Sequence, residues 1–280
     1  MAQNSHIEWT DHTFNPWTGC TNISPGCDNC YAEAWSKRSG HVKWGNNPRK
    51  RTTEQYWKAP KIWNARSDLF EAAHGRRQRV FCASLADVFD NQADPVWRRD
   101  LFELIRATPA LDWQLLTKRP QNIRKMLPRD WGDEGYPNVW LGFTAEDQAR
   151  FQQRSSVIDQ VPSTVWFVSY EPAIGPLRLE KRSPRPNWVI VGGESGHGAR
   201  PMKAAWVRNI ISDCRELGVA PFFKQWGSYK NNPLVTERGL EVERARLEDA
   251  HGKGGGMLDG ELVREFPVRK VREVEEATAA

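Results

Sequence analysis

The chain has 280 residues, of which 27% are charged and 39% are hydrophobic. This length is too great for a small disulfide module and suits one large α/β domain with a buried core. No apolar run approaches the roughly 18–20 residues that cross a bilayer, and the first residues lack the basic and apolar regions of a signal peptide. Five cysteines, three of them crowded together, do not resemble a secreted disulfide framework. We therefore expect an intracellular, cytoplasmic protein.

Short apolar runs followed by segments of helical period recur from residue 80 onward. Their starts lie 23–33 residues apart, which is the spacing of consecutive βα units. Each run is almost continuously apolar, which indicates strands buried on both faces of a parallel sheet. The predicted strands are 80–84, 113–117, 139–144, 165–169, 188–192 and 221–224, with one more near 7–14. The predicted helices are 95–108, 146–160 and 203–217.

This pattern predicts an α/β fold: a partial or complete (β/α) TIM-like barrel of about six to seven parallel strands. The alternative is an open doubly wound sheet. Polar residues follow nearly every predicted strand instead of gathering at one crevice, which favours the barrel, because its C-terminal strand ends converge on one site. We expect the barrel to cover 1–227, a hairpin or flap extension to cover 228–267, and 268–280 to be a disordered tail.

Residues 37–79 form a basic, aromatic-rich insertion. They contain twelve Lys or Arg and three Asp or Glu, in a chain whose net charge is +5. Basic residues interleaved with Trp and Tyr suit a surface that neutralises phosphates and stacks bases. The alternative is a cover whose Trp side chains pack onto the barrel while Lys and Arg face solvent. A nucleic-acid contact here would involve Arg49, Lys50 and Arg51, beside a helix expected over 53–73.

Three thiols lie within eleven residues, at Cys20, Cys27 and Cys30, with the spacing C-x6-C-x2-C. Pro25-Gly26 turns the chain back so that Cys20 can approach the other two. A helix expected from residue 28 onward places its N-terminus, which stabilises thiolates, beside them. Three thiolates suit a [4Fe–4S] cluster with one iron left open, because such a cluster normally takes four Cys. An open iron can chelate a small molecule.

The alternative for the three thiols is a structural zinc site, which needs a fourth ligand. No candidate lies at the second-pair spacing of common zinc modules. Cys82 falls in a predicted buried strand and Cys214 in a predicted helix, so both are expected to be inert core thiols. The candidate fourth ligands are His6, His12, His41, Cys82 and Cys214. We favour the iron–sulfur interpretation.

A first strand, a three-cysteine loop that leads into a helix, and a series of βα units together resemble the radical S-adenosylmethionine (SAM) superfamily. The chain is most similar to the phage-associated three-cysteine-motif proteins, a radical-SAM-like family of unassigned reaction. The spacing differs from the superfamily's usual C-x3-C-x2-C, and the aromatic residue near the last Cys is Tyr31, one place after it. The matching stretches are FNPWTGC (14–20), SPGCDNCYAE (24–33), LTKRP (116–120), SYEP (169–172), GGES (192–195), RPM (200–202) and FKQWG (223–227).

The resemblance implies an enzyme that holds a [4Fe–4S] cluster through Cys20, Cys27 and Cys30 and uses it to cleave SAM. The resulting 5′-deoxyadenosyl radical would abstract a hydrogen from an unidentified substrate, for which nucleic acid is a candidate. The implied cofactors are the cluster and SAM. The implied partner is an electron donor of flavodoxin or ferredoxin type, and no membrane partner is expected.

The resemblance also gives roles to the polar residues at the strand ends. Glu171 and Glu194 would bind the SAM ammonium or ribose, and Gly192 and Gly193 would allow close backbone approach. Further cofactor contacts would come from Tyr31, Ser84, Thr117, Thr144 and Ser169. A carboxylate or phosphate of the substrate would be held by Lys118, Arg119, Lys224 and Gln225. The simpler interpretation of each is a turn, a strand connection or a solvated helix start.

Two other functions stay open at this point. One is a zinc-stabilised, nucleic-acid-binding phage or defence accessory protein without radical chemistry. The other is a barrel hydrolase or lyase that uses Glu171, Glu194 or Lys224, with the cysteines merely structural. No Gly-x-Ser-x-Gly motif or Walker-type phosphate loop supports the hydrolase.

Overall fold

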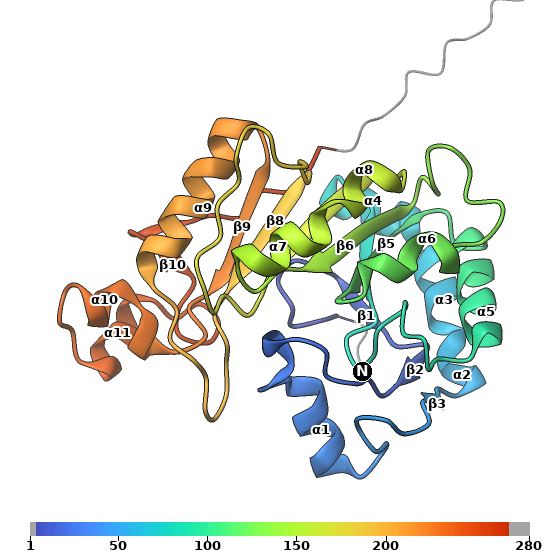
Figure 1. The fold of residues 1–280 in the computed structure, drawn as a ribbon, viewed down its shortest axis with the longest axis horizontal. Coiled ribbons are helices and arrows are strands. Elements are labelled where there is room, and N and C mark those ends of the chain that lie inside the picture. Colours follow the sequence, from blue (N-terminus) through green and yellow to red (C-terminus); the bar gives the residue numbers. More distant parts are fainter. Residues whose placement is uncertain (1–3, 269–280) are drawn as a thin grey trace, which may run out of the picture.

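Seven parallel strands form the central sheet, in the order β1-β4-β5-β6-β7-β8-β9 (Figure 1). The structure is a computed structural model that describes residues 4–268. Each predicted strand is present, with its bounds shifted by a few residues at most sites. The strands are β1 (His12–Phe14), β4 (Gln78–Cys82), β5 (Leu111–Thr117), β6 (Val139–Thr144), β7 (Val165–Tyr170), β8 (Trp188–Gly192) and β9 (Ala220–Gln225).

The strand order distinguishes between the predicted architectures. A doubly wound sheet reverses its strand order at a switch point, whereas this sheet runs in chain order from one edge to the other. In residues 4–268, β1 and β9 are the two edges and do not pair with each other, so the sheet is a half-barrel. The predicted α/β fold with about seven parallel strands is confirmed, in its partial rather than its complete form.

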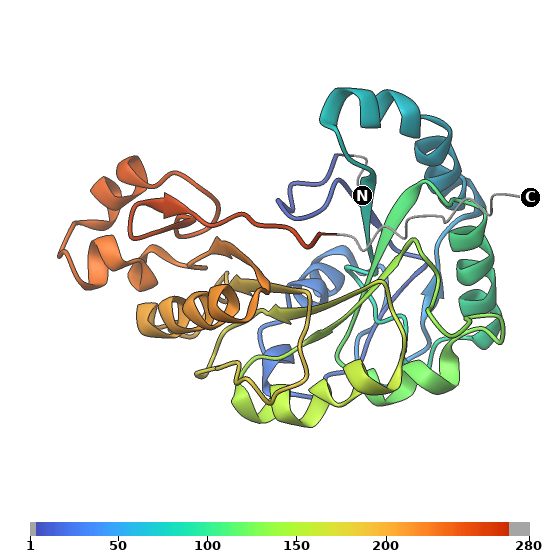
Figure 2. The ribbon, with the colours of Figure 1, turned by 90° about the horizontal axis from the view of Figure 1, so that it is seen from above.

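Helices lie along the outer side of the curved sheet (Figure 2). Helix α5 (Pro95–Arg106) begins with an N-cap, because the Asp94 side chain accepts a hydrogen bond from Val96 N at 2.8 Å. Helix α9 (Ala204–Leu217) ends at Gly218, which has the left-handed conformation with φ 68°. The predicted helix over 146–160 is divided into two pieces. These helices are α5 (Pro95–Arg106), α6 (Ile123–Met126), α7 (Gln148–Ser155), α8 (Val157–Gln160) and α9 (Ala204–Leu217), with the turn η2 (Pro120–Asn122) before α6.

Side chains on the two faces of the sheet form two separate hydrophobic clusters. On the outer face, strand residues such as Leu141 and Val168 pack with helix residues such as Phe151. On the inner face, aromatic side chains including Trp140 and Phe167 fill the concave side. Since side chains alternate along a strand, every second residue after these aromatics also faces inward. This alternation determines which strand-end residues can share a site.

The basic segment 37–79 contains one short strand and three helices, and its strand pairs with one that lies earlier in the chain. β2 (Trp17–Thr18) pairs antiparallel with β3 (Lys50–Arg51). The single helix expected over 53–73 is instead α2 (Glu54–Trp57), α3 (Ala59–Ala65) and α4 (Ser67–His74). Pro60 is the second residue of α3, and its missing N–H and fixed φ prevent α2 from continuing through it.

The region after β9 holds three short helical pieces and a hairpin. They are η3 (Tyr229–Asn231), α10 (Pro233–Thr236), α11 (Val242–Glu248), and the paired strands β10 (Met257–Leu258) and β11 (Glu261–Leu262). The following segment runs along β9, where Phe223 N donates to Val263 O at 2.9 Å and Glu265 N donates to Pro221 O at 3.0 Å. Of the tail predicted at 268–280, residues 269–280 lie outside the described residues. No helix within 4–268 is long and apolar enough to cross a membrane.

The inner face predicts a difference between two glycine substitutions. A Cβ at Gly142 would overlap the buried ring of Phe167, whereas a Cβ at Gly192 would lie 2.5 Å from the carboxylate end of Glu171, which can rotate away. Gly142→Ala should therefore lower the free energy of unfolding by about 1–3 kcal/mol, through overpacking, and Gly192→Ala by clearly less. Urea denaturation of both variants measures the difference. Equal losses would contradict this account of the inner face.

Candidate functional site

The three thiols lie on a loop that leads into helix α1 (Tyr31–Ser39) and contains the turn η1 (Pro25–Cys27). We call residues 20–30 the cysteine loop. Its backbone and side chains contact residues that follow β5, β6 and β8, while Tyr31 at the start of α1 contacts the end of β4. The loop is therefore held over the carboxyl ends of the strands, where parallel α/β folds place their sites.

Arg119, directly after β5, anchors the first cysteine. Its Nη1 lies 3.4 Å from Cys20 Sγ, and its Nη2 donates to Thr21 O at 2.9 Å. The buried guanidinium also pairs with Asp87 at 3.0 Å. Burial, with the nearby Asp87 carboxylate, raises the pKa of Cys20 to about 11, although Arg119 acts in the opposite direction. The Cys20 thiol is thus protonated at neutral pH in the metal-free chain.

Glu146, which follows β6, anchors the middle of the cysteine loop. Gly26 N donates to its Oε1 at 3.2 Å, and Arg154 donates to its Oε2 at 2.8 Å. Burial alone would raise the pKa of Glu146, but hydrogen bonds from Ser24 and Gly26 and the charge of Arg154 hold it below its usual range. A Cβ at Gly26 would lie 3.1 Å from the Glu146 carboxyl carbon, so the loop approaches this residue closely.

Glu194 and Arg200, after β8, anchor the end of the cysteine loop. Arg200 donates to both Glu194 oxygens, at 2.6 and 2.9 Å, and to Pro25 O at 2.8 Å. Asn29 Nδ2 donates to Glu194 Oε2 at 2.8 Å, and Arg200 pairs with Asp28 at 3.1 Å. Desolvation opposes ionisation of Glu194, but the hydrogen bonds from Arg200 and Asn29 outweigh it and lower its pKa.

Tyr31 joins the cysteine loop to the end of β4. Its hydroxyl donates to Ser84 O at 2.7 Å. Although the residue is 57% exposed, desolvation at the hydroxyl, followed by the nearby Cys30 and Glu171 side chains, raises the pKa of Tyr31. Tyr31 therefore stands close to both the last cysteine and the residue that follows β7. The Ser84 hydroxyl is already bonded to Asn15 at 3.0 Å.

Several of the predicted site residues do meet on the inner side of the strand ends. Thr144 and Ser169 are paired in register and share the inward parity of Trp140 and Phe167. Next to them, Lys224 pairs with Glu171 at 3.0 Å, and the Glu171 carboxylate lies directly over Gly192. Glu171, Lys224, Gly192, Thr144 and Ser169 thus form one group, which we call the inner group.

Other predicted residues are engaged elsewhere. Thr117 has the outward parity and donates to Asp87 at 2.7 Å. Gly193 packs against the carbonyl of Trp226, and the Gln225 side chain accepts from Lys253 N at 3.0 Å. Both Glu194 oxygens are occupied by Arg200 and Asn29, so Glu194 positions the cysteine loop, as Arg119 does.

The three residues expected to contact nucleic acid do not form an exposed basic patch. The Arg49 side chain is 1% exposed and pairs with Asp90 at 2.6 Å. Arg51 pairs with Asp100 at 2.8 Å and lies over the Trp57 ring. Lys50 is exposed, and its ammonium reaches a backbone carbonyl. Arg49 is therefore wrong as a phosphate contact, because a buried charge needs its carboxylate partner.

The cysteine loop offers three thiols as possible metal ligands. Within residues 4–268, no three His, Cys, Asp or Glu side chains are already gathered as a metal site. Cys82 and Cys214 are fully buried in β4 and α9, and burial raises the pKa of both thiols. His12 stacks on Trp63 and bonds Gln78 at 2.7 Å, away from the cysteine loop. Three thiols are the ligand number of a cluster with one open iron, whereas a structural zinc site takes four ligands.

The sequence interpretation named Arg119 and Glu194 as site residues but did not assign Asp87, Glu146 or Arg200 to the site. Asp87 and Glu146 each follow a strand, and Arg200 lies in the RPM stretch, but their partners are far away along the chain. Their positions at strand ends were the available signal. The pairing of Glu146 with Gly26, 120 residues apart, could be found only from the fold.

The model of a family described as "Protein of unknown function (DUF5131)" matches residues 4–267. No curated protein and no solved structure matches the chain.

The anchoring of the cysteine loop predicts a pH-dependent effect of Glu194→Gln. The folded-state pKa of Glu194 is lowered, so its stabilisation is complete above the unfolded pKa of about 4.3 and is lost as the pH falls through the folded value. The variant should lose about 1–3 kcal/mol of unfolding free energy near neutral pH, and less in acid.

Urea denaturation at several pH values tests this expectation. Glu103→Gln, at an exposed helix carboxylate with one weak ion pair, is the matched control and should change stability little. A loss for Glu194→Gln that is independent of pH would contradict an ionised Glu194 anchor.

Proposed function

We propose that this chain, which belongs to the DUF5131 family, is a radical-SAM-like iron–sulfur enzyme built on a partial TIM-like barrel. In this proposal Cys20, Cys27 and Cys30 hold a [4Fe–4S] cluster, and SAM binds at the carboxyl ends of the strands. When bound, the cluster and SAM supply a 5′-deoxyadenosyl radical for hydrogen abstraction from the substrate. A flavodoxin- or ferredoxin-type donor would supply the electron.

The observation that carries the proposal is the anchoring of the cysteine loop at several strand ends. Separate contacts through Arg119, Glu146 and Glu194–Arg200 fix the three-thiol segment over the open mouth of the sheet. A structural zinc loop needs no such position, whereas a cluster that serves a cofactor must face the strand ends. Three thiols at that place therefore support a reactive centre more than a structural one.

The charged residues beside the cysteine loop each have a task in this proposal. Arg119 directs an N–H at Cys20 Sγ, and hydrogen bonds to ligating sulfurs raise the reduction potential of a cluster. Arg200 and Glu194 hold the turn between the first cysteine and the last two. These residues position the thiols.

The inner group suits the amino acid part of SAM. Glu171 and Lys224 form an ion pair, so a carboxylate and an ammonium stand side by side. SAM carries the opposite pair, an ammonium and a carboxylate, which could exchange partners with them through charge-assisted hydrogen bonds. Gly192 leaves space under Glu171, and Thr144 and Ser169 offer neutral hydroxyls on the same face.

Anaerobic purification tests the cluster. We expect a brown protein with about four irons and four sulfides per chain. Cys20→Ala, Cys27→Ala and Cys30→Ala should each lose most of the iron. Cys82→Ala and Cys214→Ala are the controls, because both thiols are buried in regular elements, and they should keep it. A colourless protein with one zinc would favour the zinc-stabilised alternative.

The cofactor site is tested separately, by titrating SAM into the reconstituted protein. Glu171→Gln should weaken SAM binding by about tenfold to a hundredfold, because it removes one charge-assisted contact. Iron content should stay normal, since Glu171 does not contact the cysteine loop's anchors. Glu103→Gln again serves as the control. Unchanged affinity in Glu171→Gln would remove the inner group from the cofactor site.

A further inference from the structure

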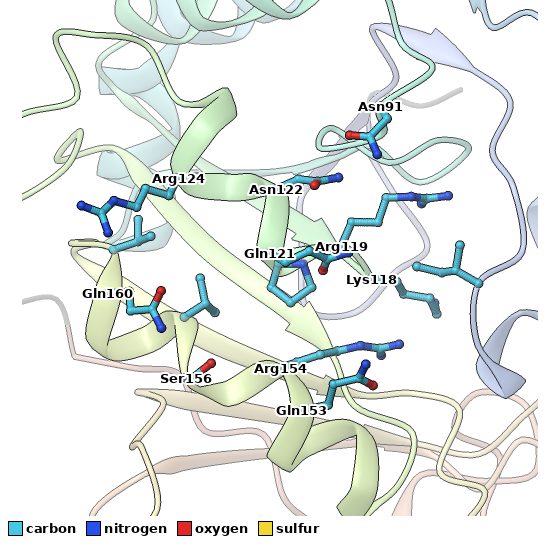
Figure 3. A pocket seen from close by; sticks show the side chains of 14 residues that line it. Asn91, Lys118, Arg119, Gln121, Asn122, Arg124, Gln153, Arg154, Ser156 and Gln160 are labelled. Atoms are coloured by element: carbon cyan, nitrogen blue, oxygen red, sulfur yellow. The ribbon is translucent and has the colours of Figure 1, made fainter.

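A cavity of about 680 Å³ lies beside the cysteine loop, between the segment that follows β5 and the helices α7 and α8. Figure 3 shows its two walls: Lys118, Arg119 and Arg124 project from one, and Gln153, Arg154 and Ser156 from the other. The remaining lining residues are Ile23, Asn91, Pro120, Gln121, Asn122, Val157, Gln160 and Val161.

The lining is basic and contains no carboxylate. Two of its four cations are already neutralised, because Arg119 pairs with Asp87 and Arg154 pairs with Glu146. In the part of the chain that the structure describes, the ammonium of Lys118 and the guanidinium of Arg124 form no salt bridge or hydrogen bond. These two charges therefore remain available to a ligand, and the ligand they attract is an anion.

The rest of the lining indicates what the anion is attached to. Five amide side chains and one hydroxyl also line the cavity. One of the amides, Asn122, already donates to Phe89 O at 2.9 Å, and the others can both donate and accept hydrogen bonds. Ile23, Pro120, Val157 and Val161 add apolar surface. A volume of about 680 Å³ exceeds what a bare phosphate needs and lies within the range of small-molecule sites.

We propose that this cavity binds a nucleotide, either free or as one unit of a single-stranded nucleic acid. Lys118 and Arg124, which lie toward opposite ends of the cavity in Figure 3, offer positive charge to its phosphate groups from either end, and the amide side chains and apolar residues contact its base and sugar. In protein–nucleic acid contacts Lys and Arg bind phosphate oxygens, while hydrogen bonds and apolar contacts read the bases.

The cavity is directly linked to the cysteine loop. Arg119 lines the cavity and also lies 3.4 Å from Cys20 Sγ, and Ile23 lines it from within the cysteine loop. A nucleotide bound here would therefore be the substrate, or part of it, for the centre proposed above. That role rests on the proposed function, whereas the binding itself does not.

The binding is tested with three probes on the purified full chain: a short single-stranded DNA oligonucleotide, AMP and inorganic phosphate. The double variant Lys118→Ala/Arg124→Ala should weaken oligonucleotide or AMP binding by at least about tenfold and reduce its salt dependence. Lys181→Ala/Arg182→Ala removes the same two charge types from an exposed turn and should change affinity by less than about twofold. Lys118→Arg/Arg124→Lys keeps both charges and should restore most of the binding.

The outcomes separate the possible sources of the ligand. Binding of the oligonucleotide alone identifies a single strand, and equally good competition by AMP identifies a free nucleotide. Competition by inorganic phosphate as strong as that by AMP would overturn the nucleotide assignment. Equal losses in the two alanine double variants, or no binding at low salt, would overturn the site itself. Iron measured in the same preparations shows whether the cluster proposal stands or fails independently.

Discussion

The cost of burying carboxylates at the strand ends governs the arrangement of this site. A carboxylate removed from water must be paired and hydrogen-bonded, or it destabilises the fold. Glu146 and Glu194 each meet this need with arginine and with hydrogen-bond donors from the cysteine loop. The loop is thus part of how the charges are satisfied, and its place over the sheet follows from them. Asp87 contacts the cysteine loop indirectly: it pairs with Arg119, which in turn contacts Cys20 and Thr21.

Much of the fold could be predicted because each strand is a local signal. Runs such as 139–144 and 188–192 are apolar throughout, and they became strands with those bounds. The insertion shows the limit of such patterns, since residues 53–73 have helical periodicity but form three short helices, with Pro60 in the first turn of the second. Closure of the barrel is not encoded in any one segment. Closure depends on whether β1 pairs with β9, and the residues of one strand do not show whether two distant strands pair.

The site was harder to predict than the fold, because composition does not show which charges are paired. Arg49 belongs to the most basic stretch of the sequence, yet its side chain is buried and pairs with the carboxylate of Asp90, 41 residues away. Lys118 and Arg124 come from a less basic segment. Within residues 4–268 their charged groups form no ion pair and face solvent or a ligand. Strand-end polarity placed both Glu171 and Lys224 at strand ends, and the fold pairs them. Strand-end polarity could not show that both Glu194 oxygens would accept hydrogen bonds from Arg200, because this pairing depends on a turn after β8.

The open shape of the sheet leaves β9 with an edge that a closed barrel would not have. Unpaired backbone groups on such an edge can recruit a strand from another molecule. Here the segment around Val263 and Glu265 takes up those groups along β9, and Arg264 lays its guanidinium over Phe222. The C-terminal extension thereby replaces the missing neighbour strand. A chain shortened before Val263 would keep the cysteine loop and the inner group, but it would expose a pairing-competent edge and tend to self-associate.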